Sequence, residues 1–590
     1  MNNAAIRYSI RPLSVHAHTF EGRCTVASPD PTGQCFSLPA WIPGSYLIRD
    51  FARHIVAIRA VSGSRPVSLT KLDKHTWQAA RLKHGESITV TCEVYAWDLS
   101  VRGAHLDETH AFFNGTSVFL RVLGQEELPC LIDIQPPAGE AFKDWRIATA
   151  LEPAHGEQHC AKRHGYGLYR AASYDELIDH PVEMGRFALA RFVARGIPHE
   201  IAITGQHDCD MQRLTADLKR ICEWQIRFFG EPAPMPRYVF LITAVGDAYG
   251  GLEHRASTAL LCSRNDLPWR GMKKMSEGYR TFLGLCSHEY FHTWNVKRIR
   301  PAAFTPYDLD RENYTTLLWA FEGITSYYDD LALLRCGAIE LQDWLELLAK
   351  TISNVQRGPG RRRQTLAESS FDAWNKFYRP DENTPNAVVS YYAKGALVAL
   401  ALDLTLRNKT NGAISLDDIM RALWQRHGKT GIGVGEEDIR LIAEECSGLN
   451  LKRFFSAAVH GTGELPLKKL LATFGLKLEW VAAETPSFGV KTADEGGQLK
   501  LTTVYDDSAA QRAGLSAGDV LLAINDLRVA STNIDKLLTR CQPGDTVKVH
   551  AFRRDELKEF RVRLDRSQDD MARLVADARP NNLRRRWLGI

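Results

Sequence analysis

The sequence predicts a multidomain α+β protein, and three observations support this fold class. The chain has 590 residues, which exceeds the size of a single hydrophobic core and suggests about three or four domains. Its first part is a succession of short alternating runs that are typical of strands, whereas its middle carries long segments with helical spacing. Its content of 44% hydrophobic and 24% charged residues is that of a soluble globular protein.

Residues 1–190 are predicted to form an N-terminal β-rich domain. Apolar and polar residues alternate there in short runs that Gly and Pro interrupt, and such alternation indicates strands with one buried face. The clearest runs cover residues 6–10, 87–94, 117–122 and 130–134. We therefore expect an antiparallel β-sandwich-like domain or an open antiparallel sheet.

Residues 191–465 are predicted to form a mostly helical domain with strands at its start. A strand is expected at 238–243 and another at 250–254, and the pattern then predicts helices at 340–355, 388–406 and 416–425. A long polar connection between 358 and 385 interrupts these helices. Long connections of this kind often have a function, so this segment could form one side of a substrate cleft.

Two further parts follow. Residues 466–566 form a separate unit of strands and short helices, and residues 567–590 form a C-terminal tail. The tail is predicted to contain a short charged helix and to end in a basic stretch. Because its last residues include Trp587 and Leu588, we expect its end to dock on the body of the protein.

The pentapeptide 288–292, HEYFH, is the strongest functional signal in the chain. A helix is predicted from about 278 to 296, with Ser276 as a candidate cap and Pro301 forcing an end soon after. On a helix, histidines at i and i+4 share one face, so both imidazoles can reach one Zn²⁺. Glu289 then lies beside them and can take a proton from the water that the metal activates. The pentapeptide alone is also compatible with two histidines of the hydrophobic core that happen to bracket a glutamate.

Glu322 is the candidate third ligand, since a catalytic zinc needs three protein ligands and an open position. Its segment also has helical spacing, with one apolar side formed by Leu317, Leu318, Phe321 and Ile324. Two histidines with a glutamate are a hydrolytic set, and the twelve cysteines contain no CxxC pair that would compete for the metal. We predict one Zn²⁺ per chain. Thr325 or Ser326 could orient a ligand or bond back to the helix backbone.

Several further segments lie in an order that matches a known family. They are 41–51 (WIPGSYLIRDF), 250–254 (GGLEH), 292–301 (HTWNVKRIRP), 369–374 (SSFDAW) and 392–395 (YAKG). With them, nearly the whole chain resembles the glycyl aminopeptidase family of gluzincin zinc metallopeptidases, relatives of the aminopeptidase N group. Leu252 stands where the family more often has methionine, which is a volume-conserving change.

The resemblance implies a thermolysin-like catalytic domain over residues 191–465. It also implies metal ligation by His288, His292 and Glu322, with Glu289 as the general base. The family uses the tyrosine that corresponds to Tyr392 to hydrogen-bond the tetrahedral intermediate. By local chemistry alone, Tyr392 would be an ordinary half-buried tyrosine.

The strand with Gly250, Gly251 and Glu253 is implied to bind the free amine of the substrate, and the family name implies a preference for N-terminal glycine or alanine. Taken locally, the two glycines would rather indicate a bulge or turn. The family signature includes the basic residues Lys297, Arg298 and Arg300. An equally good interpretation is that they form a solvated helix C-terminus, where the helix dipole favours positive charge.

The unit at 466–566 resembles a PDZ domain. Residues 508–525 match its succession of short helix, glycine turn and strand, and residues 487–490 (SFGV) look like its carboxylate-binding loop. Such a groove binds C-terminal peptides that add as a strand. The alternative is an architectural domain whose groove is occupied by another part of this chain.

Charge and composition exclude some partners. The formal net charge is +4, from 74 basic and 70 acidic residues, which is too balanced to indicate nucleic acid. No apolar run approaches the roughly 18 residues that would span a membrane. The N-terminus has no apolar leader segment and the cysteines are scattered singly, so we expect a cytoplasmic protein.

We therefore predict a zinc-dependent aminopeptidase that acts on peptides with a free N-terminus. Two alternatives remain. One is a PDZ-regulated zinc endopeptidase in protein quality control, and the other is a catalytically silent PDZ interaction protein. The complete set of His, Glu and Tyr residues argues against the silent protein.

Overall fold

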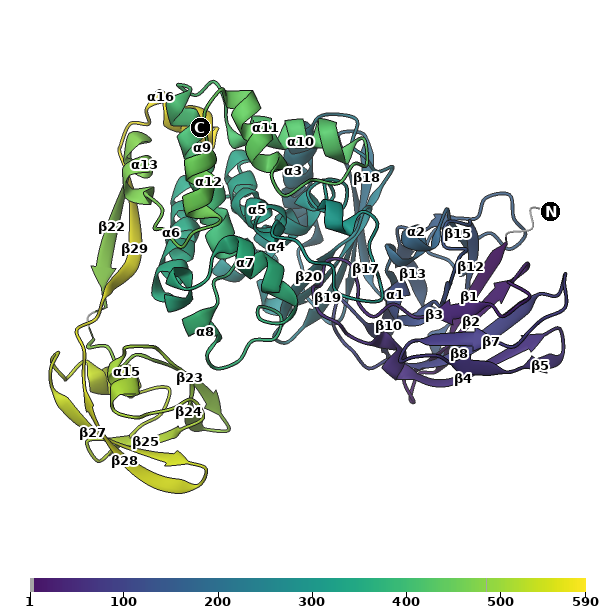
Figure 1. Cartoon of the computed structure of the whole chain (residues 1–590), viewed down its shortest axis with the longest axis horizontal. Helices are drawn as coiled ribbons and strands as arrows, with labels where there is room; N and C mark the ends of the chain where they lie inside the picture. The colour runs from purple at the N-terminus through teal and green to yellow at the C-terminus, as the bar shows by residue number, and fades with distance from the viewer. Residues whose placement is uncertain (1–4, 484, 590) are drawn as a thin grey trace. The chain divides into compact units, whose positions relative to one another are not determined.

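The computed structural model describes residues 5–483 and 485–589 (Figure 1). Residues 1–4, which contributed to the prediction of a chain without a leader, and Ile590 at the end of the predicted tail lie outside them. The chain packs as two compact units. The first comprises Met1–Asn313, Cys336–Ala338 and Trp424–Val434, and the second comprises Tyr314–Arg335, Ile339–Leu423 and Gly435–Ile590. The predicted boundaries at 190, 465 and 566 stay a proposal.

The N-terminal part of the first unit is built of three sheets, drawn in purple and blue in Figure 1. The largest has the order β14-β15-β12-β1-β2-β8-β4-β5. Its strands are β1 (Ile6–Ser14), β2 (Thr19–Val26), β4 (Ile55–Ser62), β5 (Arg65–Val67), β8 (Ile88–Tyr95), β12 (Cys130–Ile134), β14 (Glu152–Pro153) and β15 (Gly167–Ala171). The β-rich prediction is confirmed. The sheet is nevertheless mixed, because β1 and β12 run parallel.

Two smaller four-stranded sheets complete this part. One has the order β13-β16-β10-β9 and the other β11-β3-β7-β6. Their strands are β3 (Cys35–Ser37), β6 (Leu69–Lys71), β7 (Thr76–Ala79), β9 (Ala104–Leu106), β10 (His110–Phe113), β11 (Arg121–Val122), β13 (Arg146–Thr149) and β16 (Val182–Gly185).

The predicted strand at 117–122 is wrong for most of its length. Gly115–Val118 form a short helical turn, α1, and only Arg121–Val122 are a strand. Ser117 Oγ donates to the carbonyl of Asn114 at 2.8 Å. This local side-chain bond favours a turn over an extended chain.

A five-stranded sheet with the order β17-β18-β19-β21-β20 follows in the first unit. Its strands are β17 (Ala188–Ala194), β18 (Ile197–Thr204), β19 (Tyr238–Val245), β20 (Tyr249–Glu253) and β21 (Ser257–Ser263), and the helix α3 (Met211–Phe229) connects β18 to β19. The GGLEH segment therefore supplies the edge strand β20, which pairs antiparallel with β21.

The helix α4 (Glu277–Phe291) carries the HEYFH motif. Ser276 caps it as predicted, because its hydroxyl accepts from the backbone N–H of Tyr279 at 3.1 Å. The helix ends at Phe291, earlier than the predicted 296. Val296 has a φ of +132°, which an α-helix does not allow, so the chain turns sharply after the motif.

The second unit contains several helices. These are the π-helical turn η5 (Trp319–Gly323), α5 (Ile324–Arg335), α6 (Leu341–Arg357), α9 (Ala393–Lys409), α10 (Leu416–Leu423), α11 (Asp438–Ser447), α12 (Lys452–Ala458) and α13 (Leu467–Thr473). The connection 358–385 is not structureless, because it folds into α7 (Leu366–Phe371), short 3₁₀ turns and the start of α8 (Thr384–Ala387).

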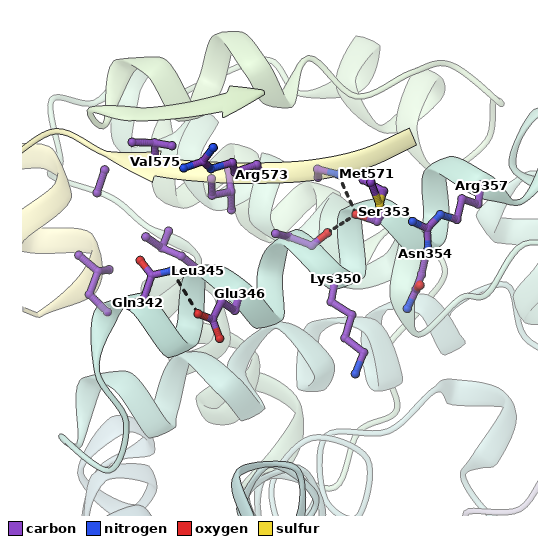
Figure 2. A pocket seen from close by; sticks show the side chains of 15 residues that line it. Gln342, Leu345, Glu346, Lys350, Ser353, Asn354, Arg357, Met571, Arg573 and Val575 are labelled. Atoms are coloured by element: carbon purple, nitrogen blue, oxygen red, sulfur yellow. Dashed lines mark hydrogen bonds between the residues drawn. The ribbon is translucent and has the colours of Figure 1, made fainter. Parts of the chain in front are cut away.

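The C-terminal tail contains a strand rather than the predicted helix at its start. Strand β29 (Asp569–Ala576) pairs with β22 (Leu476–Ala482) and faces α6 (Figure 2). Residues of β29 and α6 line a groove of about 740 Å³. Ser353 Oγ accepts from the backbone N–H of Ala572 at 2.8 Å in this groove. The tail then forms α16 (Asn582–Leu588), and Trp587 Nε1 donates to the Tyr327 hydroxyl at 2.8 Å. The predicted docking of the tail is confirmed.

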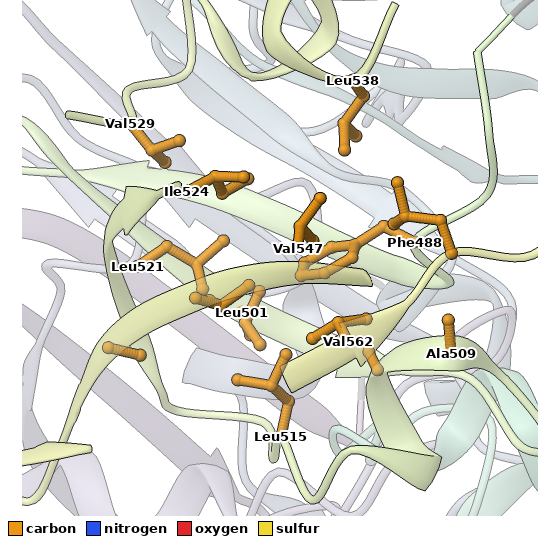
Figure 3. Packing of buried hydrophobic residues seen from close by; sticks show 14 of the residues in the cluster. Phe488, Leu501, Ala509, Leu515, Leu521, Ile524, Val529, Leu538, Val547 and Val562 are labelled. Carbon is orange, nitrogen blue, oxygen red and sulfur yellow. The ribbon is translucent and has the colours of Figure 1, made fainter. Parts of the chain in front are cut away.

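The unit that resembles a PDZ domain has the sheet order β23-β24-β25-β27-β28. Its elements are β23 (Val490–Glu495), β24 (Gln498–Val504), α14 (Ala509–Arg512), β25 (Val520–Ile524), β26 (Leu527–Arg528), α15 (Ile534–Leu538), β27 (Thr546–Arg553) and β28 (Glu556–Arg563). The predicted helix, glycine turn and strand are α14, Gly514 and β25. Its own buried core includes Phe488, Leu501, Leu521 and Val547 (Figure 3).

Among the described residues, no helix combines the length and apolar character that crossing a membrane would need.

Candidate active site

The two histidines of the HEYFH motif lie one turn apart at the C-terminal end of α4, with ring centroids 4.6 Å apart. His292 is almost fully buried, and its Nδ1 lies 2.7 Å from the carbonyl oxygen of Asn295. A carbonyl only accepts, so Nδ1 carries the proton and Nε2 keeps its lone pair. This outer hydrogen bond is the arrangement that orients a metal-ligating histidine.

Strand β20 passes directly beside Glu289. A Cβ built on Gly251 would lie 2.1 Å from Oε1 of Glu289, so a side chain at position 251 would take the place of the carboxylate. Gly250 and Gly251 pair with Leu261 and Leu260 of β21 without a shift of register. The bulge alternative is therefore wrong, and the lack of a side chain at position 251 leaves room for the Glu289 carboxylate.

Glu253, at the end of β20, is 4% exposed. Among the described residues, its Oε1 is buried and has no hydrogen-bond partner. Glu253, Glu289 and His292 each offer a ligand atom within 4.8 Å of the others. Two buried carboxylates this close favour a bound cation, either a metal ion or an ammonium group.

The segment 41–51 contributes to the same place. A Cβ built on Gly44 would lie 2.6 Å from both carboxylate oxygens of Glu253. The segment is held by Trp41, whose Nε1 donates to the carbonyl of Asp308 at 2.7 Å. Residues far apart in the sequence therefore enclose the Glu253 carboxylate within the first unit.

The basic residues after the motif are not a solvated helix end. Lys297 is 4% exposed, and its Nζ forms an ion pair with Asp179 at 2.7 Å. Arg298 donates to the carbonyl oxygen of Thr293 at 2.7 Å. Burial alone would lower the pKa of Lys297, but the Asp179 carboxylate raises it above its usual value. The pair therefore stays charged in the interior.

Asp179 also connects this pair to β20. Its carboxylate lies 3.2 Å from Nδ1 of His254 and accepts from the backbone N–H of Arg255 at 3.1 Å. Lys297 and Arg255 hold the pKa of Asp179 well below its usual value, although burial opposes this. Asp179 thereby fixes the backbone directly after Glu253.

In the second unit, Glu322 is 2% exposed and lies on the π-helical turn η5. Short π-helical segments are frequent at functional sites. The turn is held at its start by Ser370, whose Oγ accepts from the backbone N–H of Trp319 at 3.0 Å. Thr325 Oγ1 donates to the carbonyl of Phe321 at 2.6 Å, which is the backbone alternative for this residue.

Tyr392 immediately precedes α9, is half-buried, and has its hydroxyl 3.3 Å from that of Tyr378. Ser369 Oγ donates to the carbonyl of Val389 at 2.5 Å, shortly before Tyr392. The serine pair at 369 and 370 therefore ties the segments of Glu322 and Tyr392 together. Sequence reasoning missed Tyr378, because nothing distinguishes it from other aromatic residues in a polar connection.

The first unit thus brings together His288, His292, Glu289, Gly251 and Glu253, with Gly250 next to them on β20. The second unit holds Glu322 and Tyr392 on two helices that it packs against each other.

The chain is similar to known protein families and to solved structures. Models of three families match the chain: the peptidase M61 N-terminal domain at residues 7–186, the M61 glycyl aminopeptidase at 281–398, and a PDZ domain at 486–564. The crystal structure of an aminopeptidase N family protein from Idiomarina loihiensis is 42% identical, covers 99% of this chain and 100% of its own, and superposes with a TM-score of 0.94.

An M1 zinc metallopeptidase from Deinococcus radiodurans matches 78% of this chain and 94% of its own at 12% identity. Its TM-score of 0.49 is too low to support an argument about this chain. No curated protein matched the sequence.

Proposed function

Because the chain belongs to the M61 glycyl aminopeptidase family and is a peptidase, we propose that it is a zinc-dependent aminopeptidase that hydrolyses the first peptide bond of its substrates. One observation carries this proposal. The buried carboxylate of Glu253, which has an unsatisfied oxygen, lies beside Glu289 and His292. A peptidase with a carboxylate at that position is suited to a substrate that carries a positive charge, such as the α-ammonium group of a peptide.

The metal proposed is one Zn²⁺, held by His288 and His292 of α4 and by Glu322 of η5. The donor set fits, because two imidazoles and one carboxylate with an open position are the ligands of hydrolytic zinc. The bond from His292 Nδ1 to Asn295 supports the fit, because it makes Nε2 the ring nitrogen that carries the lone pair. Zinc bound there would supply a water whose pKa is lowered toward ~7 and would polarise the substrate carbonyl.

Glu289 is proposed as the general base. Its carboxylate accepts the proton of the attacking water and then delivers a proton to the leaving amine. The close contact between Gly251 and Glu289 supports this role, because it places the substrate-binding strand next to the carboxylate. A substrate laid along β20 would thus have its first peptide bond near Glu289.

Tyr392 is proposed to donate a hydrogen bond to the oxyanion that develops during attack, since preorganised donors act most strongly where charge grows. Glu253 is proposed to pair with the α-ammonium group of the substrate, next to Gly250 and Gly251. An internal peptide bond would leave the Glu253 carboxylate buried without a cation, so this pairing makes the enzyme an exopeptidase.

The resemblance to the family further supports a preference for N-terminal glycine or alanine. The PDZ domain is proposed to bind C-terminal peptides, which would add as a strand with residues 487–490 around the carboxylate. We also propose that the chain divides into four parts, with boundaries after residues 190, 465 and 566.

The test compares an Ala-terminated dipeptide with its N-acetyl form. Acetylation removes the cation, so we expect cleavage of the free dipeptide and essentially none of the acetylated one. Glu253→Ala should slow cleavage of the free dipeptide and reduce the difference in rate between the free and the acetylated substrate. Comparable cleavage of both substrates would favour the PDZ-regulated endopeptidase, and cleavage of neither would favour the silent interaction protein.

A further inference from the structure

A second group of metal-ligating side chains lies in the N-terminal part, on the hairpin of β9 and β10. His105 stands opposite Phe112 in this hairpin, so His105 and His110 project from the same face. Asp107, two residues after His105, lies at the turn on that face. His105, Asp107 and His110 each offer a ligand atom within 4.8 Å of the others.

The hydrogen bonds of the cluster resemble those of a metal site. His110 Nδ1 lies 3.1 Å from Oε1 of Glu183 on the neighbouring strand β16. A histidine that binds a metal usually donates its other ring nitrogen to such a carboxylate. Glu183 is in turn fixed by Thr204, whose hydroxyl donates to the same oxygen at 2.9 Å. Nε2 of His110 is thereby left for a ligand.

The geometry of the other two ligands fits as well. His105 Nε2 lies 3.3 Å from Oδ2 of Asp107. Two ligands that bind one tetrahedral Zn²⁺ at 2.0–2.2 Å are separated by about 3.4 Å. The other oxygen of Asp107 is occupied, because it accepts from the backbone N–H and hydroxyl of Thr109. Oδ2 is therefore the oxygen that is oriented toward the histidines.

The charge of the cluster also favours a cation. Among the described residues, neither Asp107 nor Glu183 forms an ion pair with a lysine or arginine; Asp107 pairs with His105, and Glu183 pairs with His110. Glu183 is 3% exposed and His105 is 4% exposed, so both side chains lie away from bulk water. The carboxylates of Asp107 and Glu183 carry two negative charges, and a divalent ion bound to the two imidazoles in their neutral form would neutralise them.

We propose that His105, Asp107 and His110 form a second cation site, which binds a divalent transition-metal ion such as Zn²⁺ and is buttressed by Glu183. The ion ties the turn of the hairpin to both of its strands. The side chain of Asp107 is 20% exposed, which gives the ion a path from solvent and leaves a position for water. This site is independent of the proposed catalytic zinc.

The test measures zinc per chain in the full-length protein after removal of metal and reloading with Zn²⁺. Asp107→Asn keeps an oxygen for the turn but replaces Oδ2 by an NH₂ group, which has no lone pair for a metal. Glu108→Gln is the matched control, because it removes a charge from the exposed neighbouring position of the same turn. We expect Asp107→Asn to hold about one zinc fewer per chain than the wild type and Glu108→Gln.

The difference of one ion is expected whatever the content at the HEYFH motif, so failure of the proposed function does not affect the result. Equal zinc content in all three proteins would overturn the proposal and leave the cluster as histidines that share protons with Glu183 and Asp107. Anomalous diffraction at the zinc edge from wild-type crystals needs no variant. A peak at His105 and His110 would support the site, and its absence after zinc loading would refute it.

Discussion

Gly323 and Gly395 bring two helical backbones into direct contact in the second unit. A Cβ built on Gly323 would lie 2.6 Å from the Cα of Gly395, and a Cβ built on Gly395 would lie 2.9 Å from the Cα of Gly323. Gly323 follows Glu322, and Gly395 is three residues after Tyr392. The contact therefore sets the spacing between the proposed third metal ligand and the proposed oxyanion donor.

Gly395→Ala should destabilise the protein and reduce its activity. The added methyl group has no space between the backbones, and overpacking of this kind costs about 1–3 kcal/mol. Thermal unfolding and hydrolysis of an Ala-terminated dipeptide would measure the two effects. Gly246→Ala is the control, since a Cβ there meets nothing within 4 Å. An unchanged melting temperature in Gly395→Ala would show that the helices move apart easily.

His288→Ala and Glu322→Ala should each lower the zinc content by about one ion per chain, because loss of one of three protein ligands weakens a zinc site strongly. Elemental analysis of the purified full chain measures this. His84→Ala, at an exposed position outside the motif, should not change the content. If both ligand variants kept all their zinc, the assignment of these ligands would be wrong.

Glu289→Gln should keep zinc and fold but lose activity by about 10²–10⁴-fold, since an amide cannot accept the proton from water. Turnover of the free dipeptide and zinc content would be measured together. Glu277→Gln in the first turn of the same helix is the matched control and should leave kcat unchanged. Near-normal turnover in Glu289→Gln would move the general base to another residue.

Tyr392→Phe should lower kcat by about 10²–10³-fold with a smaller change in KM, because a single oxyanion donor contributes this much. Tyr378→Phe removes the neighbouring hydroxyl at 3.3 Å and separates direct donation from positioning. We expect it to have the weaker effect. A larger loss in Tyr378→Phe than in Tyr392→Phe would reverse the two roles.

His199 should make the protein less stable as the pH falls. Burial lowers the pKa of His199 to about 4, and its Nε2 lies 2.9 Å from the hydroxyl of Tyr290 in α4. An unfolded histidine binds a proton below about pH 6.5. Between pH 6.5 and 4 the unfolded chain therefore binds more protons than the folded one. As the pH is lowered through this range, the free energy of unfolding decreases by up to about 3 kcal/mol.

Chemical denaturation between pH 7 and 4 would measure this effect. The stability of His199→Phe should depend less on pH in that window, because the titrating group is gone. His16→Gln removes an exposed histidine and should follow the wild type. Parallel pH profiles for the wild type and His199→Phe would contradict the assignment.

The sequence by itself determined the features that rest on local geometry. The spacing of His288 and His292 places both on one helical face, Ser276 caps that helix, and the alternation in the first 190 residues specifies strands. These features depend on residues within a few positions of one another, so their pattern is visible along the chain. The order of the family segments added the candidate roles of Glu253 and Tyr392.

Only the tertiary structure decided the features that depend on distant residues. The contact of Gly251 with Glu289, the burial of Lys297 against Asp179 and the approach of Gly323 to Gly395 each join separate elements. The sequence left Lys297 equally compatible with a solvated helix end, because its burial depends on a carboxylate more than a hundred positions away. A pattern along the chain records which faces are apolar, but the partner that each buried charge finds is set by how the elements pack.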